Sequence, residues 1–222
     1  MKKYFKLEII VLALASIVMA GILVFIFWPK KDTSQTPQLT QPEDKSQENI
    51  KPAGPKKVIS EPIAGAESRV TKKPFGIYIT PQNSPVQPEK FSGYHTGTDF
   101  ETTPEEASQD IPVYAICTGK IRNKEIVSGY GGVIVQECTV DGQIVTVLYG
   151  HLNIRQAQVL SIGAEVKSGE RIGSLALANS DMSGGERKHL HLGVHKGSTT
   201  NFQGYVDNQP ELSEWLDVQK YL

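Results

Sequence analysis

The sequence predicts a mainly β domain, an antiparallel β-sandwich or folded-over barrel, preceded by a transmembrane helix and a disordered linker. Short runs rich in Val, Ile and Tyr recur in the second half of the chain and alternate with glycine-containing turns, which is typical of antiparallel strands. An uncharged apolar segment near the N-terminus has the length of a membrane span. The stretch between them contains too few large apolar residues to form a core.

Residues 9–28 form the apolar segment, which is about as long as a helix must be to cross a bilayer. A cleaved signal peptide has a shorter apolar region of roughly 7–15 residues, so we expect an uncleaved anchor in contact with lipid. Three lysines lie in residues 1–8 and two follow residue 28. The positive-inside rule then places residues 1–8 in the cytoplasm, and the chain is a single-pass protein of the cell membrane.

Residues 29–62 are rich in Pro, Gln, Lys, Glu and Ser, and we expect a flexible tether that separates the membrane from an extracytoplasmic domain at residues 63–222. The chain has 23 basic and 24 acidic residues, with no basic concentration beyond short lysine pairs. This charge balance gives no support to a nucleic-acid partner. Two cysteines are too few for a disulfide-rich scaffold or a cysteine-built zinc site.

Four strands are expected in the first part of the domain, at residues 113–116, 120–127, 132–137 and 143–149. Asp141-Gly142 is a strong hairpin signal and would pair residues 132–140 with residues 143–149. Glycines recur through residues 159–175 and indicate two tight turns around short strands, and residues 189–195 form a further strand. Helical structure is expected only near residues 103–108 and at 210–222.

The run KHLHLGVHKG at residues 188–197 places His189 and His191 on one face of a strand, because side chains alternate along a strand. The run GYHTGTDF at residues 93–100 adds His95 and Asp99. Two imidazoles and a carboxylate suit zinc, and three protein ligands leave a position open for water. We therefore expect the two runs to meet around one catalytic zinc ion per chain.

His95 and Asp99 require a bend between them. Four residues of extended chain cover roughly 13 Å, whereas zinc–ligand bonds of about 2 Å keep the donor atoms close together. Gly97 supplies backbone freedom for this bend, so the pair is expected at a strand end or in a loop.

His151 follows a predicted strand at the point where a loop begins. If His191 is the third ligand, His151 and His189 remain available as bases or electrostatic stabilisers, since imidazole titrates near neutrality. A lone His-x-His is more often a surface feature than a metal site. Its combination with His95, Asp99 and His151 favours the metal site.

The motifs HTGTD, LYGHL and HLHLGVH, together with the Pro-Phe-Gly opening at residues 74–76, resemble the lysostaphin-like (LytM-type, β-lytic) zinc metallopeptidases. These enzymes cut peptide bonds of bacterial peptidoglycan, and the resemblance covers residues 74–201. It implies an antiparallel β domain with a groove walled by loops. It also implies zinc ligation by His95, Asp99 and His191, with His151 and His189 as the catalytic histidines.

Two departures from the family pattern concern the groove. The family often continues His-x-His with Phe-Glu, whereas this sequence continues with Leu192-Gly193, and residues 81–93 form a longer, proline-rich segment. Groove shape and substrate preference are therefore open. His195, Tyr94 and Asn83 are candidates for substrate binding, each against the simpler alternative of a packing or solvent-exposed residue.

Cys117 and Cys138 flank a predicted hairpin, which could bring them opposite each other. An extracytoplasmic location would allow a disulfide between them, and two buried free thiols are the alternative.

These observations together predict a membrane-anchored zinc endopeptidase that hydrolyses cross-bridge or stem peptides of peptidoglycan through a zinc-activated water assisted by two histidines. A non-catalytic module of the same fold that binds cell wall or activates another hydrolase is the alternative. A metallopeptidase directed at a bacteriocin-type peptide is a second one. A protein regulator of access to the groove is a further candidate partner.

Overall fold

The structure is a computed structural model that describes residues 58–156 and 160–222. The predicted anchor at residues 9–28 and residues 29–57 of the predicted linker lie outside the described residues. Within the described part of the chain, no helix is long and apolar enough to span a membrane. The segment 58–62 packs on the domain, because Ile59 is 5% exposed and belongs to the core, and its N–H donates to the carbonyl of Tyr221.

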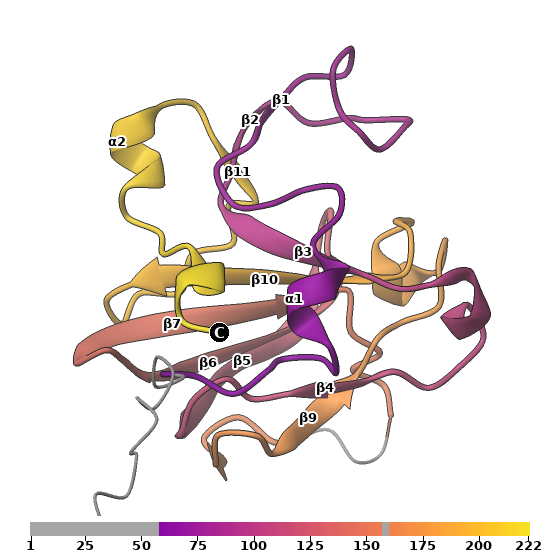
Figure 1. Ribbon diagram of the computed structural model, residues 1–222. Coiled ribbons are helices and arrows are strands. Elements are labelled where there is room, and N and C mark those ends of the chain that lie inside the picture. The colour runs from indigo at the N-terminus through magenta and orange to yellow at the C-terminus, as the bar shows by residue number, and fades with distance from the viewer. Residues whose placement is uncertain (1–57, 157–159) are drawn as a thin grey trace, which may run out of the picture. The chain divides into compact units, whose positions relative to one another are not determined.

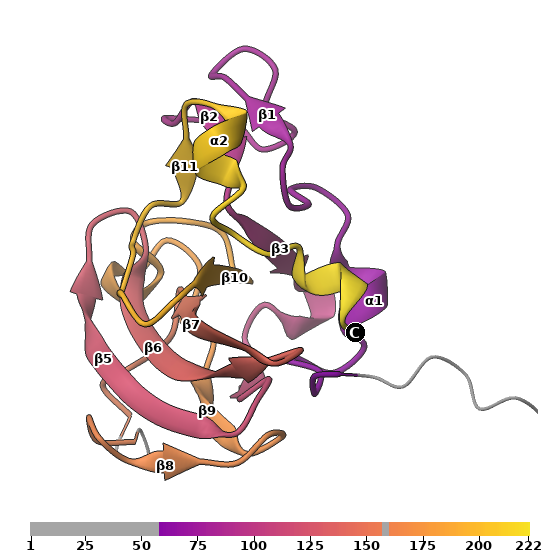
Figure 2. The same ribbon diagram turned by 90° about the vertical axis from the view of Figure 1, so that its left-hand side faces the viewer.

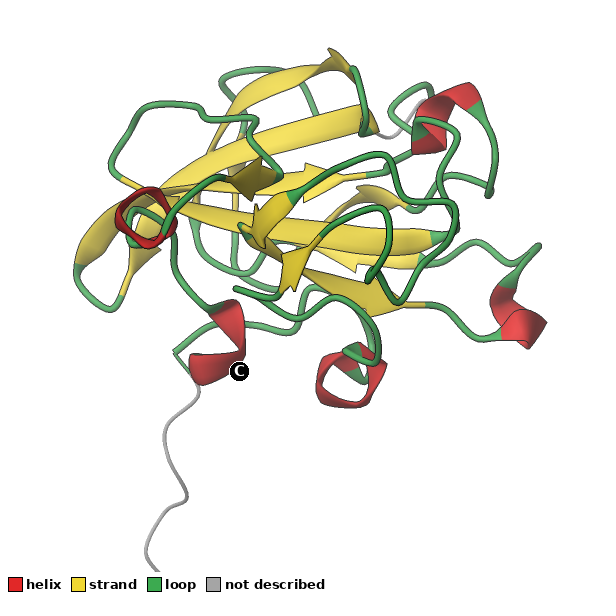
Figure 3. Ribbon diagram, turned by 90° about the horizontal axis from the view of Figure 1, so that it is seen from above, coloured by secondary structure: helices red, strands yellow, loops and turns green. Residues whose placement is uncertain are grey.

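Strands dominate the described residues, and the helices are short pieces at the periphery (Figure 3). The strands are β1 (Tyr78–Ile79), β2 (Gly93–His95), β3 (Gly97–Glu101), β4 (Pro112–Tyr114), β5 (Gly119–Val127), β6 (Gly131–Val140), β7 (Gln143–Gly150), β8 (Glu165–Val166), β9 (Arg171–Ser174), β10 (His189–Lys196) and β11 (Tyr205–Val206). The helices are α1 (Ala66–Arg69) and α2 (Gln209–Leu212), with 3-10 turns η1 (Pro104–Glu106), η2 (Asp181–Ser183) and η3 (Val218–Lys220).

The main element is a curved six-stranded antiparallel sheet with the order β3-β10-β7-β6-β5-β8 (Figures 1 and 2). Its β6–β7 hairpin turns at Asp141-Gly142, as the sequence predicted, and both turn residues have positive φ. Such a turn matches the right-handed twist of the two strands it joins. The prediction of a mainly antiparallel β domain is confirmed.

One face of this sheet forms the hydrophobic core. Tyr149, Leu190 and Phe100 point from three neighbouring strands into a single cluster of buried residues. The cluster also contains Val113 of β4 and Ile172 of β9, which belong to a separate two-stranded sheet. The β4–β9 pair therefore closes the concave side of the large sheet, and the opposite face of β3 and β10 is left to carry polar side chains.

The C-terminal segment differs from the helix predicted at residues 210–222. Helix α2 ends at Leu212, and the chain then runs along the last residues of β10, which extend beyond β3, and there Leu216 N–H donates to the Val194 carbonyl. Lys196 N–H donates to the carbonyl of Glu214 in the same way. This pairing replaces helical hydrogen bonds, because a short isolated helix is only marginally stable and tertiary contacts decide its fate.

Candidate metal centre and active-site cleft

The chain passes from the small sheet β1-β2-β11 to the large sheet at Thr96. His95 ends β2, at a strand end as predicted, whereas Asp99 lies in the middle of β3 and not at a strand end or in a loop. Thr96 holds the bend through its N–H, which donates to Gly204 O at 3.0 Å, and its hydroxyl, which donates to Gln203 O at 2.6 Å. The bend brings His95 Nε2 to 3.3 Å from Asp99 Oδ1.

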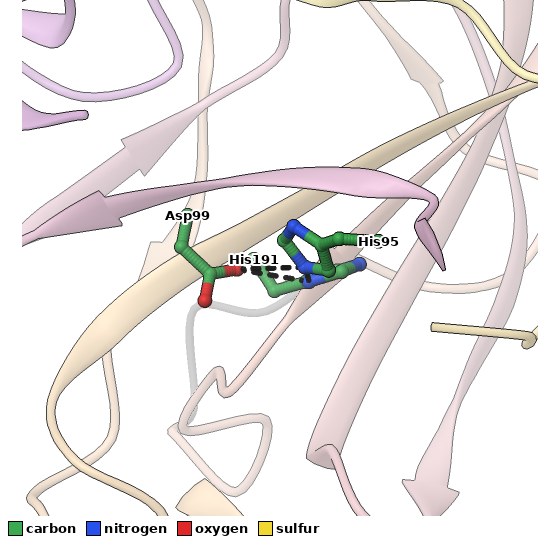
Figure 4. Close-up of side chains that lie close together, drawn as sticks. All are labelled: His95, Asp99 and His191. Carbon is green, nitrogen blue, oxygen red and sulfur yellow. Dashed lines mark hydrogen bonds and ion pairs between the residues drawn. The ribbon is translucent and has the colours of Figure 1, made fainter. Parts of the chain in front are cut away.

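The register between β3 and β10 places the third side chain. His191 lies directly opposite Asp99 in this antiparallel pair, and opposite residues project on the same face. Its Nδ1 lies 3.0 Å from Asp99 Oδ1 and 3.1 Å from His95 Nε2. Figure 4 shows the three side chains pointing toward one another.

Gly97 has a different role from the predicted one. The bend itself falls at Thr96, and a Cβ atom at residue 97 would lie 2.5 Å from His191 Nε2 and 2.9 Å from the Leu192 carbonyl oxygen. Glycine is required here because the imidazole of His191 lies against the backbone of β3.

The three donor atoms fit zinc. Tetrahedral zinc with bonds of about 2.0–2.2 Å places its ligand atoms about 3.3 Å apart, and the three atoms lie 3.0–3.3 Å from one another. All three residues are buried. His95 Nδ1 lies 3.2 Å from the carbonyl of Pro74, which only accepts, so this nitrogen carries the proton and Nε2 keeps its lone pair for a metal.

The charge states of these groups also suit a metal. Burial lowers the pKa of His191 to about 4, so its imidazole is neutral at neutral pH. Burial by itself raises the pKa of Asp99, but the neighbouring side chains of His189, His95 and His191 outweigh it and hold the pKa well below its usual value. Neutral imidazole and ionised carboxylate are the forms that ligate zinc.

Two further imidazoles lie beside the triad. The rings of His151 and His189 are 4.3 Å apart between centroids. Nδ1 of His151 lies 2.9 Å from the Ser183 carbonyl, so the proton is on Nδ1 and Nε2 carries a lone pair. In His189, Nδ1 lies 2.9 Å from the carbonyl of Arg187 and Nε2 lies 3.3 Å from Asp99 Oδ2, so both nitrogens face acceptors.

The environment of His151 is unusual in two respects. Burial and the neighbouring His189 and His191 hold the pKa of His151 well below its usual value. Its backbone has φ 61°, a left-handed conformation that costs free energy in a residue other than glycine. The surrounding chain holds it there: its N–H donates to Tyr130 O and its carbonyl accepts from Ala176 N–H.

These side chains face a cleft with a volume of about 300 Å³. One wall carries the candidate ligands Asp99 and His191 with His151 and His189. Aromatic rings form much of the remaining surface, and they come from Phe91, Tyr130, Phe202 and Tyr205. The cleft therefore combines a polar reaction centre with walls that are partly aromatic and partly charged, because Lys73, Glu89 and Arg187 also line it.

The residues predicted to bind substrate lie elsewhere. His195 packs against Trp215, with ring centroids 4.8 Å apart, and Tyr94 packs against Tyr78 at 4.8 Å. Asn83 accepts a hydrogen bond from Thr80 N–H within a turn. None of these three predicted residues lines the cleft.

Several cleft residues were missed from the sequence. Tyr130 stands between two glycines that shape a turn, and its hydroxyl lies 3.3 Å from His191 Nε2. Burial raises the pKa of Tyr130 well above its usual value, so it stays protonated. Arg187 lies two residues before His189, outside the strand predicted at residues 189–195, so no strand pattern in the sequence pointed to it.

Cys117 and Cys138 are joined by a disulfide, with Cα atoms 6.1 Å apart. Cys138 lies on β6 opposite Gly119, so the strand pairing brings the loop before β5 next to β6. No free cysteine remains among the residues that the structure describes.

A β domain with this donor set in a cleft has the architecture of a metal-dependent hydrolase. Residues 93–203, half of the chain, match the family model described as peptidase family M23. The chain belongs to this family of zinc-dependent metallopeptidases, and the resemblance to lysostaphin-like peptidases is confirmed. A comparison with curated proteins found no match.

Solved structures of similar proteins include the antimicrobial peptidase lysostaphin from Staphylococcus simulans, with 20% identity over 75% of this chain and 53% of that chain, and a TM-score of 0.45. LytU is similar with 26% identity over 69% of this chain and 90% of that chain, and a TM-score of 0.43. Csd3 of Helicobacter pylori has 19% identity over 74% of this chain, at a TM-score of 0.42. This chain spans about 33% of the length of Csd3.

Proposed function

We propose that the chain is a zinc endopeptidase that hydrolyses peptide bonds in the cross-bridge or stem peptides of peptidoglycan. One observation carries this proposal: donor atoms of His95, Asp99 and His191 converge to within 3.3 Å of one another, and Asp99 and His191 line one cleft with two further imidazoles. Membership of peptidase family M23 and the motif resemblance to lysostaphin-like peptidases support the reaction and the substrate.

His95, Asp99 and His191 would hold one zinc ion. When bound, zinc supplies a Lewis acid that polarises a peptide carbonyl and makes water more acidic. Hydrogen bonds from the surrounding protein fix the ligands before the metal arrives, because His95 Nδ1 donates to Pro74 O and Asp99 Oδ2 accepts from Arg187. Such partners set the orientation of metal ligands.

His151 and His189 have different hydrogen-bonding capacities, and we assign them different roles. His151 presents an unprotonated Nε2, so it accepts a proton from the water that attacks the peptide carbonyl and later delivers it to the leaving amine. Nδ1 of His189 is held by the Arg187 carbonyl, whereas its Nε2 makes only a 3.3 Å contact with Asp99, so Nε2–H would donate instead to the carbonyl oxygen of the substrate and stabilise negative charge on it.

The location follows from the same proposal. Residues 9–28 would anchor the protein in the cell membrane, and residues 29–57 of the predicted linker would tether an extracytoplasmic domain within reach of the cell wall. A protein regulator would act by controlling access to the cleft.

Purified peptidoglycan incubated with the full chain tests the proposal. Mass spectrometry of the soluble products should detect peptides with new amino termini when zinc is present, and none after treatment with a chelator. His151→Ala serves as the catalytic control. If the zinc-loaded protein releases nothing yet sediments with peptidoglycan, the chain is instead a binding or activator module. Absence of both release and sedimentation would favour a metallopeptidase that acts on a separate peptide.

A further inference from the structure

Arg187 lies between two carboxylates at the edge of the candidate metal centre. Its Nη2 donates to Asp99 Oδ2 at 2.8 Å, and its Nε donates to Glu101 Oε2 at 2.9 Å. The side chain is 18% exposed, so these contacts are largely shielded from water. We propose that Arg187, anchored by Glu101, is a positioning residue that holds Asp99 as a one-oxygen ligand and orients His189. This inference rests on the proposed zinc site.

The first step concerns the two oxygens of Asp99. Oδ2 accepts from Arg187 Nη2 and lies 3.3 Å from His189 Nε2. Oδ1 faces His191 Nδ1 at 3.0 Å and His95 Nε2 at 3.3 Å. Arg187 therefore separates the oxygens by function: one binds a guanidinium and the other is left to the metal. A carboxylate without this partner can rotate or bind through both oxygens.

The second step concerns the anchor of Arg187. Asp99 and Glu101 are two residues apart on β3, so their side chains share one face and stand roughly 6.6–7 Å apart along the strand. A planar guanidinium can reach both with separate N–H groups, which a lysine ammonium cannot do in the same geometry. Glu101 also offsets the charge of Arg187, so the guanidinium is not a lone positive charge beside a cation site.

The third step concerns the main chain of the same residue. The Arg187 carbonyl accepts a hydrogen bond from His189 Nδ1 at 2.9 Å. The side chain of Arg187 thus fixes a candidate ligand while its backbone fixes the ring of the neighbouring imidazole. Restraining the side chain restrains the backbone that orients His189, which couples the metal ligand to the catalytic histidine.

Arg187→Lys tests the inference, because it keeps the positive charge and removes the planar guanidinium that bonds both carboxylates. Positioning partners of metal ligands typically contribute 10–100-fold to metal affinity, so the zinc dissociation constant, measured by chelator competition on the full chain, should rise by about that factor. The visible spectrum of the Co²⁺-substituted protein should also change, because it reports the number and geometry of the ligands.

Arg171→Lys is the matched control. Arg171 also pairs with a carboxylate, that of Asp110, at 2.6 Å, and its side chain is 42% exposed. This pair does not contact the candidate ligands, so the control should bind zinc and Co²⁺ as the natural protein does. A zinc affinity within twofold of the natural value and an unchanged Co²⁺ spectrum in the Arg187 variant would overturn the inference.

Glu101→Gln provides a second variant if Arg187→Lys does not fold. It removes the anchor while Arg187 keeps its bond to Asp99, so the affinity loss should be smaller and in the same direction. An unchanged affinity and spectrum for Glu101→Gln would also count against the inference. If the natural protein binds neither Zn²⁺ nor Co²⁺, the proposed function itself fails. If the natural protein binds metal and the variants bind it equally well, only the inference about Arg187 fails.

Discussion

Gly97→Ala introduces a single methyl group beside the candidate metal centre. The new Cβ would lie 2.5 Å from His191 Nε2, 2.6 Å from Cε1 of the same ring and 2.9 Å from the Leu192 carbonyl oxygen. Optimal separations between such atoms are about 3.5–4.0 Å, so the imidazole must move by roughly 1 Å. The backbone oxygen lies in a paired strand and cannot move aside.

His191 has little room for this movement. It is 4% exposed, and the rings of Tyr130 and His95 lie 5.0 and 4.9 Å from it between centroids. Metal sites tolerate ligand displacements of about 0.2 Å, so we expect zinc affinity to fall at least tenfold. Overpacking of this kind also costs about 1–3 kcal/mol of folding stability.

Chelator competition gives the zinc affinity of the variant, and urea unfolding of the zinc-free protein gives its stability. Gly173→Ala is the control, because Gly173 also lies in a strand and its Cβ would meet Leu152 and Ile134 at ordinary distances of 3.8 and 3.9 Å. It should leave zinc affinity unchanged. If Gly97→Ala binds zinc as tightly as the control does, the placement of His191 against β3 is incorrect.

Three other predictions follow from separate contacts. His151→Ala should keep zinc, since its Nδ1 bonds to a backbone carbonyl, and should lower the hydrolysis rate by roughly 10²–10⁴-fold, as single-turnover kinetics would reveal. Hydrogen bonding to Arg69 lowers the pKa of Glu106 from 4.5 to about 2, so its contribution to stability is complete above pH 4.5 and disappears as the pH falls toward 2. Urea unfolding of Glu106→Gln should therefore show a loss of about 1 kcal/mol at pH 7 that shrinks across this window, and a loss independent of pH would exclude the ion pair as its cause. The Cys117–Cys138 disulfide closes a loop over a sequence separation of 21, so replacing both residues by serine should cost about 3 kcal/mol, and alkylation of the unreduced protein should label neither thiol.

Local patterns in the sequence predicted the features that depend on neighbouring residues. Strand alternation placed His189 and His191 on one face, and the Asp-Gly pair predicted the β6–β7 hairpin. The need for a bend between His95 and Asp99 followed from bond lengths alone. These arguments succeed because strand geometry is fixed by covalent structure and does not depend on distant contacts.

Features that depend on distant contacts were not accessible in this way. The register that sets His191 opposite Asp99 joins residues 92 positions apart. The C-terminal residues had a helical pattern, yet their backbone pairs with the last residues of β10, where Trp215 packs against His195. Tyr94 adjoins His95 and so points to the other face of β2, where it meets Tyr78.

Anomalous diffraction from crystals of the zinc-loaded protein, recorded on both sides of the zinc absorption edge, tests the central claim most directly. We predict one peak per chain within about 2.0–2.2 Å of His95 Nε2, Asp99 Oδ1 and His191 Nδ1. No peak at this position, or a peak that involves His151 or His189 in place of these atoms, would contradict the account.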